Sequence, residues 1–436
     1  MEAIRVGLLG AGVVGSGVVS VLKRNREEIA RRAGREIRVV QVCARNLEKA
    51  RQLVGDEVQV VADPIAMATS PDVDVLVEVI GGTTVAKDAI LAALKAGKAV
   101  VTANKALLAT AGNEVFAAAR AGRVPVMFEA AVAGGIPIIK ALREGLAANR
   151  MQWVAGIING TTNFILSEMR AKRLPFEAVL KEAQRLGYAE ADPTFDIEGV
   201  DAAHKLTLLS ALAFGIPVQF DRASVEGISK LQAADIAYAE ELGYRIKLLG
   251  ITRKHPAGIE LRVHPTLVPA KRLIASVEGA MNAVLIKGDA VGATLYYGPG
   301  AGSEPTASAV IADLVDVTRL FTADPEHRVP ALAFQHDALA ATPILPMSEV
   351  ETAAYMRLRV ADQAGVLADI TRILADSNIS IDAVLQKEAA DGSSETDLII
   401  LTHRTKEGSI NAAIARMEML RSVKGKVVRI RMEELA

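Results

Sequence analysis

Short apolar segments alternate with longer amphipathic ones over the first 130 residues. The apolar segments are rich in branched side chains and end in glycine or polar turns, which predicts buried strands over Ile4–Leu9, Ile37–Cys43, Asp74–Ile80, Ala99–Thr102 and Val124–Phe128. The intervening composition predicts helices over Val13–Arg32, Ala86–Ala96 and Thr110–Ala121. Strands that alternate with helices need crossover connections, so we expect a parallel α/β sheet over residues 1–130.

The pattern changes after residue 130. Residues 131–323 mix helical runs with strand-like pieces such as Ile259–His264 and Ala283–Lys287, which is typical of an α+β substrate domain. Residues 324–352 hold four prolines and are interpreted partly as a linker. Residues 353–436 follow the order βαββαβ of a ferredoxin-like module, with elements expected over Ala354–Val360, Gly365–Ser377, Ile379–Leu385, Thr396–Thr402, Ser409–Arg421 and Val427–Ile430.

Composition narrows the function classes. Hydrophobic residues make up 51% of the 436 positions, which excludes a disordered chain. Lys and Arg total 50 against 51 Asp and Glu, so no basic surface for nucleic acid is indicated. The one cysteine, Cys43, excludes an internal disulfide framework and a cysteine-cluster metal site, and it indicates a reducing, cytoplasmic compartment. The uncharged run Val6–Leu22 contains five glycines and lacks a basic leader, so a strand and a turn explain it better than a signal peptide or a membrane span.

A glycine-rich turn, Gly10-Ala11-Gly12-Val13-Val14-Gly15, follows the first predicted strand and opens a helix. Gly10 permits the tight turn, Gly12 lets a pyrophosphate approach the backbone, and Gly15 lets helix and strand pack closely. The helix start at Val13 and Val14 offers free N–H groups to phosphates. We therefore expect a Rossmann-type dinucleotide-binding domain, with a plain tight turn as the alternative.

Cofactor choice depends on the end of the second strand. NAD-preferring sites usually place Asp or Glu there to bond the ribose 2′-hydroxyl. This strand ends Val42-Cys43-Ala44-Arg45, without an acid, and Arg45 could hold a 2′-phosphate. The sequence favours NADP, with NAD possible, unless Arg45 is only a solvated surface arginine.

Five acids fall between Glu190 and Asp201, in a stretch punctuated by Gly187 and Gly199. Asp201 and Lys205 are four residues apart, so on a helix they would share one face, roughly 5–6 Å apart. A carboxylate that precedes a lysine at this spacing suits a helix start and holds the ammonium in place. By spacing alone, an exposed ion pair worth a few tenths of a kcal/mol is the commoner explanation.

The stretch that contains these acids resembles the signature of homoserine dehydrogenases. The signature is A-x3-G-[aromatic]-x3-D-P-x2-D-[aliphatic]-x-G-x-D-x3-K, and it matches at Ala183, Gly187, Tyr188, Asp192, Pro193, Asp196, Ile197, Gly199, Asp201 and Lys205. The resemblance covers about residues 4–325 and includes further pieces at Glu78–Gly82, Thr102–Lys105, Phe128–Ile138, Asn159–Asn163 and Gly298–Thr306.

The resemblance implies the reversible NAD(P)H-dependent reduction of L-aspartate 4-semialdehyde to L-homoserine, on the route to threonine, methionine and isoleucine. Lys205 would then be the proton donor and acceptor, and Lys105 a second catalytic residue that lies between nicotinamide and substrate. The implied substrate contacts are Glu190, Asp196 and Asp201, and the implied cofactor contacts beyond the glycine turn, Arg45 and Lys105 are Gly187 and Gly302.

The resemblance also implies a cation and an assembly. Glu129, together with the carbonyls of Val132, Gly134 and Ile136, resembles the family's sodium site. Hard cations take oxygen ligands, although a simple bend with Glu129 in a salt bridge would explain the same residues. Residues 131–323 would carry the dimerisation surface of a homodimer or homotetramer, and a helix near residues 305–321 would return to the first domain.

The residue types agree with this chemistry. Hydride transfer to an aldehyde builds negative charge on its oxygen, which a cation or acid must neutralise. A lysine with the reference pKa of ~10.4 is protonated at pH 7 and can be that acid. The reverse oxidation needs the neutral amine and should therefore speed up with rising pH. His204 would face away from a substrate that Lys205 faces, so we expect a partly buried structural histidine.

The segment Leu358–Ile370 resembles the first strand, loop and helix of an ACT domain, which implies a regulatory module over residues 353–436 with threonine as the effector. The candidate contacts are Asp362, Gly365, Val366, Leu367 and Gln386. A dimerisation module without a ligand is the alternative. Two other functions stay open: a catalytically silent amino-acid sensor, and another ACT-bearing dehydrogenase, which would use a catalytic histidine.

Overall fold

The computed structural model describes residues 2–325, 328–388 and 393–435. Contacts divide the chain into two compact units. The first consists of Met1–Gly160, Val200–Ala223 and Ala280–Thr342, and the second of Thr161–Gly199, Ser224–Gly279 and Pro343–Ala436. Within the described ranges, no helix is both long enough and apolar enough to cross a membrane.

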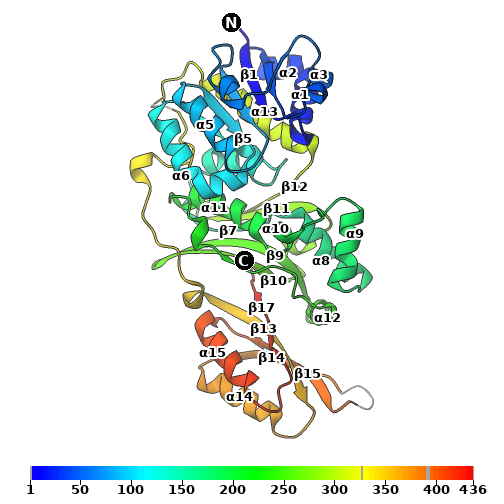
Figure 1. The fold of residues 1–436 in the computed structure, drawn as a ribbon. Helices are drawn as coiled ribbons and strands as arrows, with labels where there is room; N and C mark the ends of the chain where they lie inside the picture. Colours follow the sequence, from blue (N-terminus) through cyan, green and yellow to red (C-terminus); the bar gives the residue numbers. More distant parts are fainter. Residues whose placement is uncertain (1, 326–327, 389–392, 436) are drawn as a thin grey trace. The chain divides into compact units, whose positions relative to one another are not determined.

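A six-stranded sheet in the first unit, to which β1 and β5 in Figure 1 belong, has the order β3-β2-β1-β4-β5-β6, and every pairing in it is parallel. The change of direction between β1 and β4 is the switch point where such folds bind dinucleotides. The Rossmann-type sheet is therefore confirmed. Its strands are β1 (Ile4–Leu9), β2 (Ile37–Cys43), β3 (Gln59–Val61), β4 (Val75–Glu78), β5 (Ala99–Thr102) and β6 (Val126–Met127).

The helices of this sheet differ from the prediction in several places, and α6 begins at Lys105 rather than at Thr110. The single helix expected over Val13–Arg32 is wrong, because Asn25 leaves helical geometry (φ −109°, ψ 21°) and separates two helices. The short elements β3, α3 and α4 escaped prediction because none has a long apolar run. The helices are α1 (Val13–Arg24), α2 (Arg26–Ala33), α3 (Leu47–Val54), α4 (Pro64–Thr69), α5 (Val85–Lys95) and α6 (Lys105–Ala121).

The first unit also contains an antiparallel group of strands, β7 (Met151–Ile157), β11 (Met281–Gly288) and β12 (Gly292–Pro299). Helix α11 (Val200–Phe214) packs against β7 and buries nearly all of its side chains. Helix α13 (Ser303–Leu320) packs against α1, and the Ser303 hydroxyl donates to the Val13 carbonyl at 2.7 Å. Helix α13 therefore starts against the glycine turn of the nucleotide-binding sheet.

The second unit contains the predicted βαββαβ module, with the sheet order β17-β13-β15-β14 (Figure 1). Its elements are β13 (Glu351–Ala361), α14 (Val366–Asp376), β14 (Ile381–Gln386), β15 (Glu395–Thr402), α15 (Glu407–Glu418) and β17 (Val428–Met432). The two helices pack against the sheet over a core that includes Ile370, Leu398 and Ile410. The ferredoxin-like order is confirmed.

The module shares its sheet with the rest of the second unit, because β17 pairs in parallel with β10 (Gly258–Pro269). Strand β10 is also paired with β9 (Tyr244–His255) in antiparallel fashion. A fully buried guanidinium joins the two parts: Arg262 contacts Glu260 at 2.8 Å and Glu433 at 2.5 Å. The other elements here are α8 (Gly160–Lys172), α9 (Phe176–Arg185), α10 (Thr194–Ile197), β8 (Ser224–Val225) and α12 (Ala233–Glu241).

Candidate functional site

The glycine turn between β1 and α1 has the geometry that a pyrophosphate needs. A Cβ on Gly15 would lie 2.0 Å from the Gly10 carbonyl oxygen, so only glycine allows the helix this close to the strand. A Cβ on Gly12 would meet nothing within 4 Å, which leaves space in front of the helix start. Helix α1 has no acid in its first turn, and Val13 is 70% exposed. The turn can therefore accept an anionic cofactor on free N–H groups.

Arg45 lies beside this turn. The Gly10 N–H donates to the Cys43 carbonyl at 2.9 Å, which places the end of β2 next to the start of the turn. Arg45 follows two residues later and is exposed, so its guanidinium is accessible to a ligand. Gly302, at φ +128°, precedes α13, and Ser303 bonds Val13; this predicted cofactor residue thus also lies against the turn.

Asp201 joins two lysines from different elements. It lies in the first turn of α11 and is 3% exposed. One of its carboxylate oxygens, Oδ2, accepts the Lys205 Nζ at 2.6 Å and the Asn159 Nδ2 at 2.8 Å. The other oxygen lies 3.1 Å from the Lys105 Nζ at the start of α6. The Asp201–Lys205 pair on one helical face is therefore confirmed, and it is buried rather than an exposed surface pair.

The ammonium of Lys205 has a second fixed partner. Its Nζ donates to the Ile158 carbonyl at 2.7 Å, just after the end of β7. Two acceptors on two elements thus hold the head group of a side chain that is 11% exposed. Sequence reasoning assigned no role to Asn159 or to the Ile158 carbonyl. The only signal for them was that Asn159 begins one of the segments that resemble the family.

The electrostatics of the cluster favour an ionised carboxylate. Burial alone would raise the pKa of Asp201, but the charges of Lys205 and Lys105 and the hydrogen bonds lower it strongly. His204, next in the helix, is 5% exposed, and burial lowers its pKa to about 4. Its ring packs edge-on against Phe220 with centroids 4.3 Å apart. His204 is therefore neutral at pH 7, which agrees with the structural role predicted for it.

Three predicted site residues belong to the second unit. Gly187, at φ +79°, follows the end of α9, and Glu190, three residues later, is exposed. Asp196 lies in α10, where its carboxylate accepts the Thr161 hydroxyl at 3.3 Å. The structure thus joins Lys105, Asp201 and Lys205 in one unit, whereas Gly187, Glu190 and Asp196 are part of the other.

The predicted cation loop has an unusual backbone. Ala133 (φ +56°) and Gly134 (φ +50°) are consecutive left-handed residues, and a Cβ on Gly134 would lie 2.5 Å from the Gly300 carbonyl oxygen. The Glu129 carboxylate already accepts the N–H groups of Ile139 and Lys140, both at 2.8 Å. The described residues hold no cluster of three or more His, Cys, Asp or Glu side chains suited to a metal. Any cation here would depend mainly on backbone carbonyls.

The candidate effector residues occupy one end of the ACT sheet. Asp362, Gly365, Val366 and Leu367 form the turn between β13 and the start of α14, where Gly365 has φ +95°. Gln386 is the exposed last residue of β14. Leu367 is 40% exposed, whereas Val366 is buried in the module's core. The turn offers a helix start to a carboxylate.

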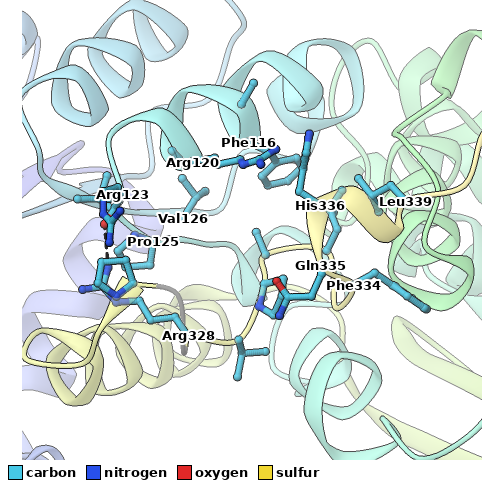
Figure 2. A pocket seen from close by; sticks show the side chains of 18 of the residues that line it. Phe116, Arg120, Arg123, Pro125, Val126, Arg328, Phe334, Gln335, His336 and Leu339 are labelled. Carbon is cyan, nitrogen blue, oxygen red and sulfur yellow. Dashed lines mark hydrogen bonds between the residues drawn. The ribbon is translucent and has the colours of Figure 1, made fainter.

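A cavity of about 780 Å³ lies elsewhere in the first unit. Figure 2 shows Phe116 and Arg120 of α6 on one side of it and Arg328, Phe334 and His336 on another. None of the predicted site residues lines it. The size of this cavity therefore does not identify the catalytic site.

Comparison with known proteins connects this geometry to a family. A family model described as homoserine dehydrogenase matches residues 137–315, its NAD binding domain matches residues 10–129, and an ACT domain matches residues 354–418. A curated homoserine dehydrogenase from Pseudomonas aeruginosa is 59% identical over 435 residues, which cover 100% of both chains.

Solved structures of homoserine dehydrogenases are also similar to this chain. The crystal structure of a homoserine dehydrogenase from Thiobacillus denitrificans is 67% identical, has a TM-score of 0.96, and covers 100% of this chain and 99% of its own. A hyperthermophilic archaeal homoserine dehydrogenase in complex with NADPH is 26% identical, with a TM-score of 0.63 over 73% of this chain and 98% of its own. This full-length agreement is evidence against both competing functions. The chain belongs to the homoserine dehydrogenase family, as an NAD(P)-dependent oxidoreductase with an NAD-binding domain and a C-terminal ACT domain.

Proposed function

We propose that Lys205 donates a proton to the substrate oxygen when aspartate semialdehyde is reduced, and accepts one when homoserine is oxidised. The observation that carries this proposal is the buried ammonium of Lys205, held by Asp201 at 2.6 Å and by the Ile158 carbonyl at 2.7 Å. NADPH, when bound, supplies the hydride to the carbonyl carbon. As the carbonyl electron pair moves to oxygen, Lys205 transfers a proton to it and becomes a neutral amine. Asp201 holds the ammonium in position and favours its charged form.

Lys105 would support the same step from the other side of Asp201. Its side chain is 34% exposed, and its Nζ lies 3.1 Å from the Asp201 Oδ1. This accessible ammonium suits contact with the developing negative charge or with the substrate's α-carboxylate. Glu190 and Asp196 carry the opposite charge and suit the substrate's α-ammonium.

We expect NADP as the preferred cofactor. Arg45 is exposed just beyond β2, and the open space at Gly12 fits a pyrophosphate. The archaeal relative bound to NADPH supports this choice. The measurement is kcat/KM with NADPH and with NADH. Arg45→Ala should lower the NADPH value about tenfold or more and leave the NADH value nearly unchanged. Arg38→Ala, an exposed arginine at the start of β2, is the matched control.

A sodium ion in the loop formed by residues 129–136 is part of the same proposal. Two consecutive left-handed residues, Ala133 and Gly134, bend the loop that carries the carbonyls of Val132, Gly134 and Ile136, which we propose as ligands. The Ile136 carbonyl also accepts the Ile138 N–H at 2.8 Å, so the ion would share that oxygen. Activity measured while sodium replaces choline at constant ionic strength tests the site, and a flat response contradicts it.

We further propose that threonine binds the turn between β13 and α14 as a feedback inhibitor, and that the enzyme works as a homodimer or homotetramer. The free helix start at Gly365 supports binding of an amino-acid carboxylate. Threonine titration of the activity checks the first point. Light scattering coupled to size-exclusion chromatography checks the second.

Substitution of Lys205 tests the central proposal. Lys205→Met keeps the aliphatic length and removes the proton donor, so kcat for NADPH oxidation with aspartate semialdehyde should fall at least about 10²-fold. Lys95→Met, at the exposed end of α5, is the matched control and should be unchanged. A smaller loss for Lys205→Met, in a protein that still binds NADPH, would mean that another group supplies the proton.

A further inference from the structure

We propose that Glu78, Thr102 and Asn104 form a buried hydrogen-bond relay that positions both the glycine turn after β4 and the ammonium of Lys105. These three are positioning residues, since none of them is placed against the reacting atoms. The inference rests on the role proposed above for Lys105.

Glu78 is a carboxylate at the end of an otherwise apolar buried strand. It follows Val75-Leu76-Val77 in β4 and is 0% exposed. Its Oε1 accepts the N–H groups of Ile80 at 2.9 Å and Gly81 at 3.0 Å, and its Oε2 accepts the Thr102 hydroxyl at 2.6 Å. All three donors are neutral. Burial of a carboxylate costs free energy unless hydrogen bonds such as these satisfy it. An apolar residue could fill the same space without that cost, so packing alone does not account for a glutamate here.

Thr102 and Asn104 carry the relay from Glu78 to helix α6. The Thr102 Oγ1 accepts the Asn104 N–H at 3.0 Å while its own proton goes to Glu78. The Asn104 side chain then divides its bonds between two elements. Its Nδ2 donates to the Gly82 carbonyl at 2.7 Å, and its Oδ1 caps α6 by accepting the Leu107 N–H at 3.0 Å.

The relay fixes two features that have little rigidity of their own. Gly81 (φ +71°) and Gly82 (φ +78°) are successive left-handed glycines. Because glycine can adopt many backbone conformations, the turn is not rigid by itself. The bonds from Glu78 and Asn104 select one of these conformations. Lys105 is the first residue of α6, directly after Asn104, and its Nζ lies 3.1 Å from Asp201. A shift of the helix start would therefore move this ammonium.

The position of the relay connects it to catalysis. Glu78 and Thr102 end the adjacent parallel strands β4 and β5, and β4 borders the switch point with β1. Cofactors bind at the carboxyl ends of strands at such a point. The turn and Lys105 thus belong to the edge of the sheet that faces the cofactor, where a displacement of about 1 Å can cost about 10²-fold in rate.

Isosteric substitution of the threonine separates its hydroxyl from its shape. Thr102→Val removes the bonds to Glu78 and Asn104 but keeps the volume, so kcat with saturating NADPH and aspartate semialdehyde should fall about 10- to 100-fold. Thr102→Ser keeps the hydroxyl and should recover kcat to within about threefold of the wild type. Thr110→Val is the matched control, because that exposed hydroxyl bonds only backbone carbonyls within α6. Equal losses for the valine and serine variants, or no loss for valine, would overturn the inference.

A double-mutant cycle distinguishes positioning from general damage. If the relay acts through Lys105, Thr102→Val should lower kcat by less than about threefold in a Lys105→Met background. A full additional loss would refute positioning of Lys105. An unchanged kcat for Lys105→Met alone would instead refute the role proposed for Lys105, whereas a loss in Lys105→Met with none in Thr102→Val refutes only the relay.

A second variant covers the case in which Thr102→Val does not fold. Asn104→Asp keeps the oxygen that caps α6 but replaces the donor to the Gly82 carbonyl with a repelling oxygen. We expect the helix to persist, the thermal midpoint to stay within a few degrees of the wild type, and kcat to fall about tenfold or more. Wild-type kcat in this folded variant would also overturn the inference.

Discussion

Replacement of Asp201 by asparagine should disable the enzyme while keeping its shape. The carboxylate accepts hydrogen bonds from Lys205 and Asn159 on one oxygen and an ammonium from Lys105 on the other. An amide at the same place must turn an N–H₂ group towards one of these donors. It also leaves two ammonium groups without the charge that lies between them.

The distances from Asp201 to the two lysines give the size of the expected loss in kcat. At an effective dielectric constant of about 20, charges 2.6 Å and 3.1 Å apart attract by ~6 and ~5 kcal/mol before the cost of desolvation. The Lys105 contribution is discounted because its side chain is 34% exposed and water screens it. The loss of one partner from a buried pair typically costs ~3–5 kcal/mol. Taking the lower end, we expect kcat for aldehyde reduction at pH 7 to fall ~10²-fold.

The pH profile gives the sharper measurement. Without Asp201 the neutral amine of Lys205 becomes easier to form. The pH at which the rate of homoserine oxidation increases should therefore be lower by about one unit or more. Stopped-flow measurement of NADPH formation between pH 6 and 10 would show this shift, with substitution of the exposed α5 residue Asp88 (Asp88→Asn) as the control. A variant with wild-type kcat and an unmoved profile would refute the idea that Asp201 governs Lys205.

Three other outcomes are expected. Gly15→Ala should abolish NADPH binding in a fluorescence titration, because its Cβ would lie 2.0 Å from the Gly10 carbonyl oxygen; retained affinity would contradict this geometry. Arg262→Leu should lower the free energy of unfolding in urea by about 3 kcal/mol, because it removes the fully buried cation between Glu260 and Glu433 and leaves them only Arg253, at 3.7 Å and 2.9 Å; a loss below about 1 kcal/mol would argue against it. Burial opposes ionisation of Glu433, but the charges and hydrogen bonds of Arg262 and Arg253 lower its pKa from 4.5 to about 2. The stability that this ionised carboxylate contributes is therefore present above pH 4.5 and lost as the pH falls towards 2. Glu433→Gln should reduce that acid sensitivity in urea unfolding at pH 6 and pH 3.

Local patterns predicted most of the fold. The strands β1, β2 and β5 and the βαββαβ order follow from short apolar runs bounded by turns. The break at Asn25 was missed because the helical pattern continues across it, and a single polar residue gives no strong stop signal. The parallel pairing of β17 with β10 was also beyond local patterns, because it joins strands that are distant in the sequence.

In the candidate site, as in the fold, local spacing predicted some contacts and missed those between distant segments. The spacing of Asp201 and Lys205 predicted their contact, since four residues make one helical turn. Nothing in the spacing could bring Lys105 to the same carboxylate, and its place in the site came from resemblance to a family. The Ile158 carbonyl and the Glu78–Thr102 bond are backbone or buried contacts between distant segments, which no residue pattern encodes.

The shared carboxylate explains why the site can hold two lysines together. Asp201 is ionised because their charges lower its pKa, and burial keeps His204 neutral, with a pKa of about 4. Two ammonium groups and one carboxylate then leave one net positive charge in a largely buried cluster. An aldehyde gains one negative charge on its oxygen as it accepts a hydride, so a cluster that contacts this oxygen as proposed would complement the transition state better than the neutral carbonyl. An isolated pair of Lys205 and Asp201 would have no net charge, so the positive charge that we propose for stabilising the oxyanion depends on Lys105.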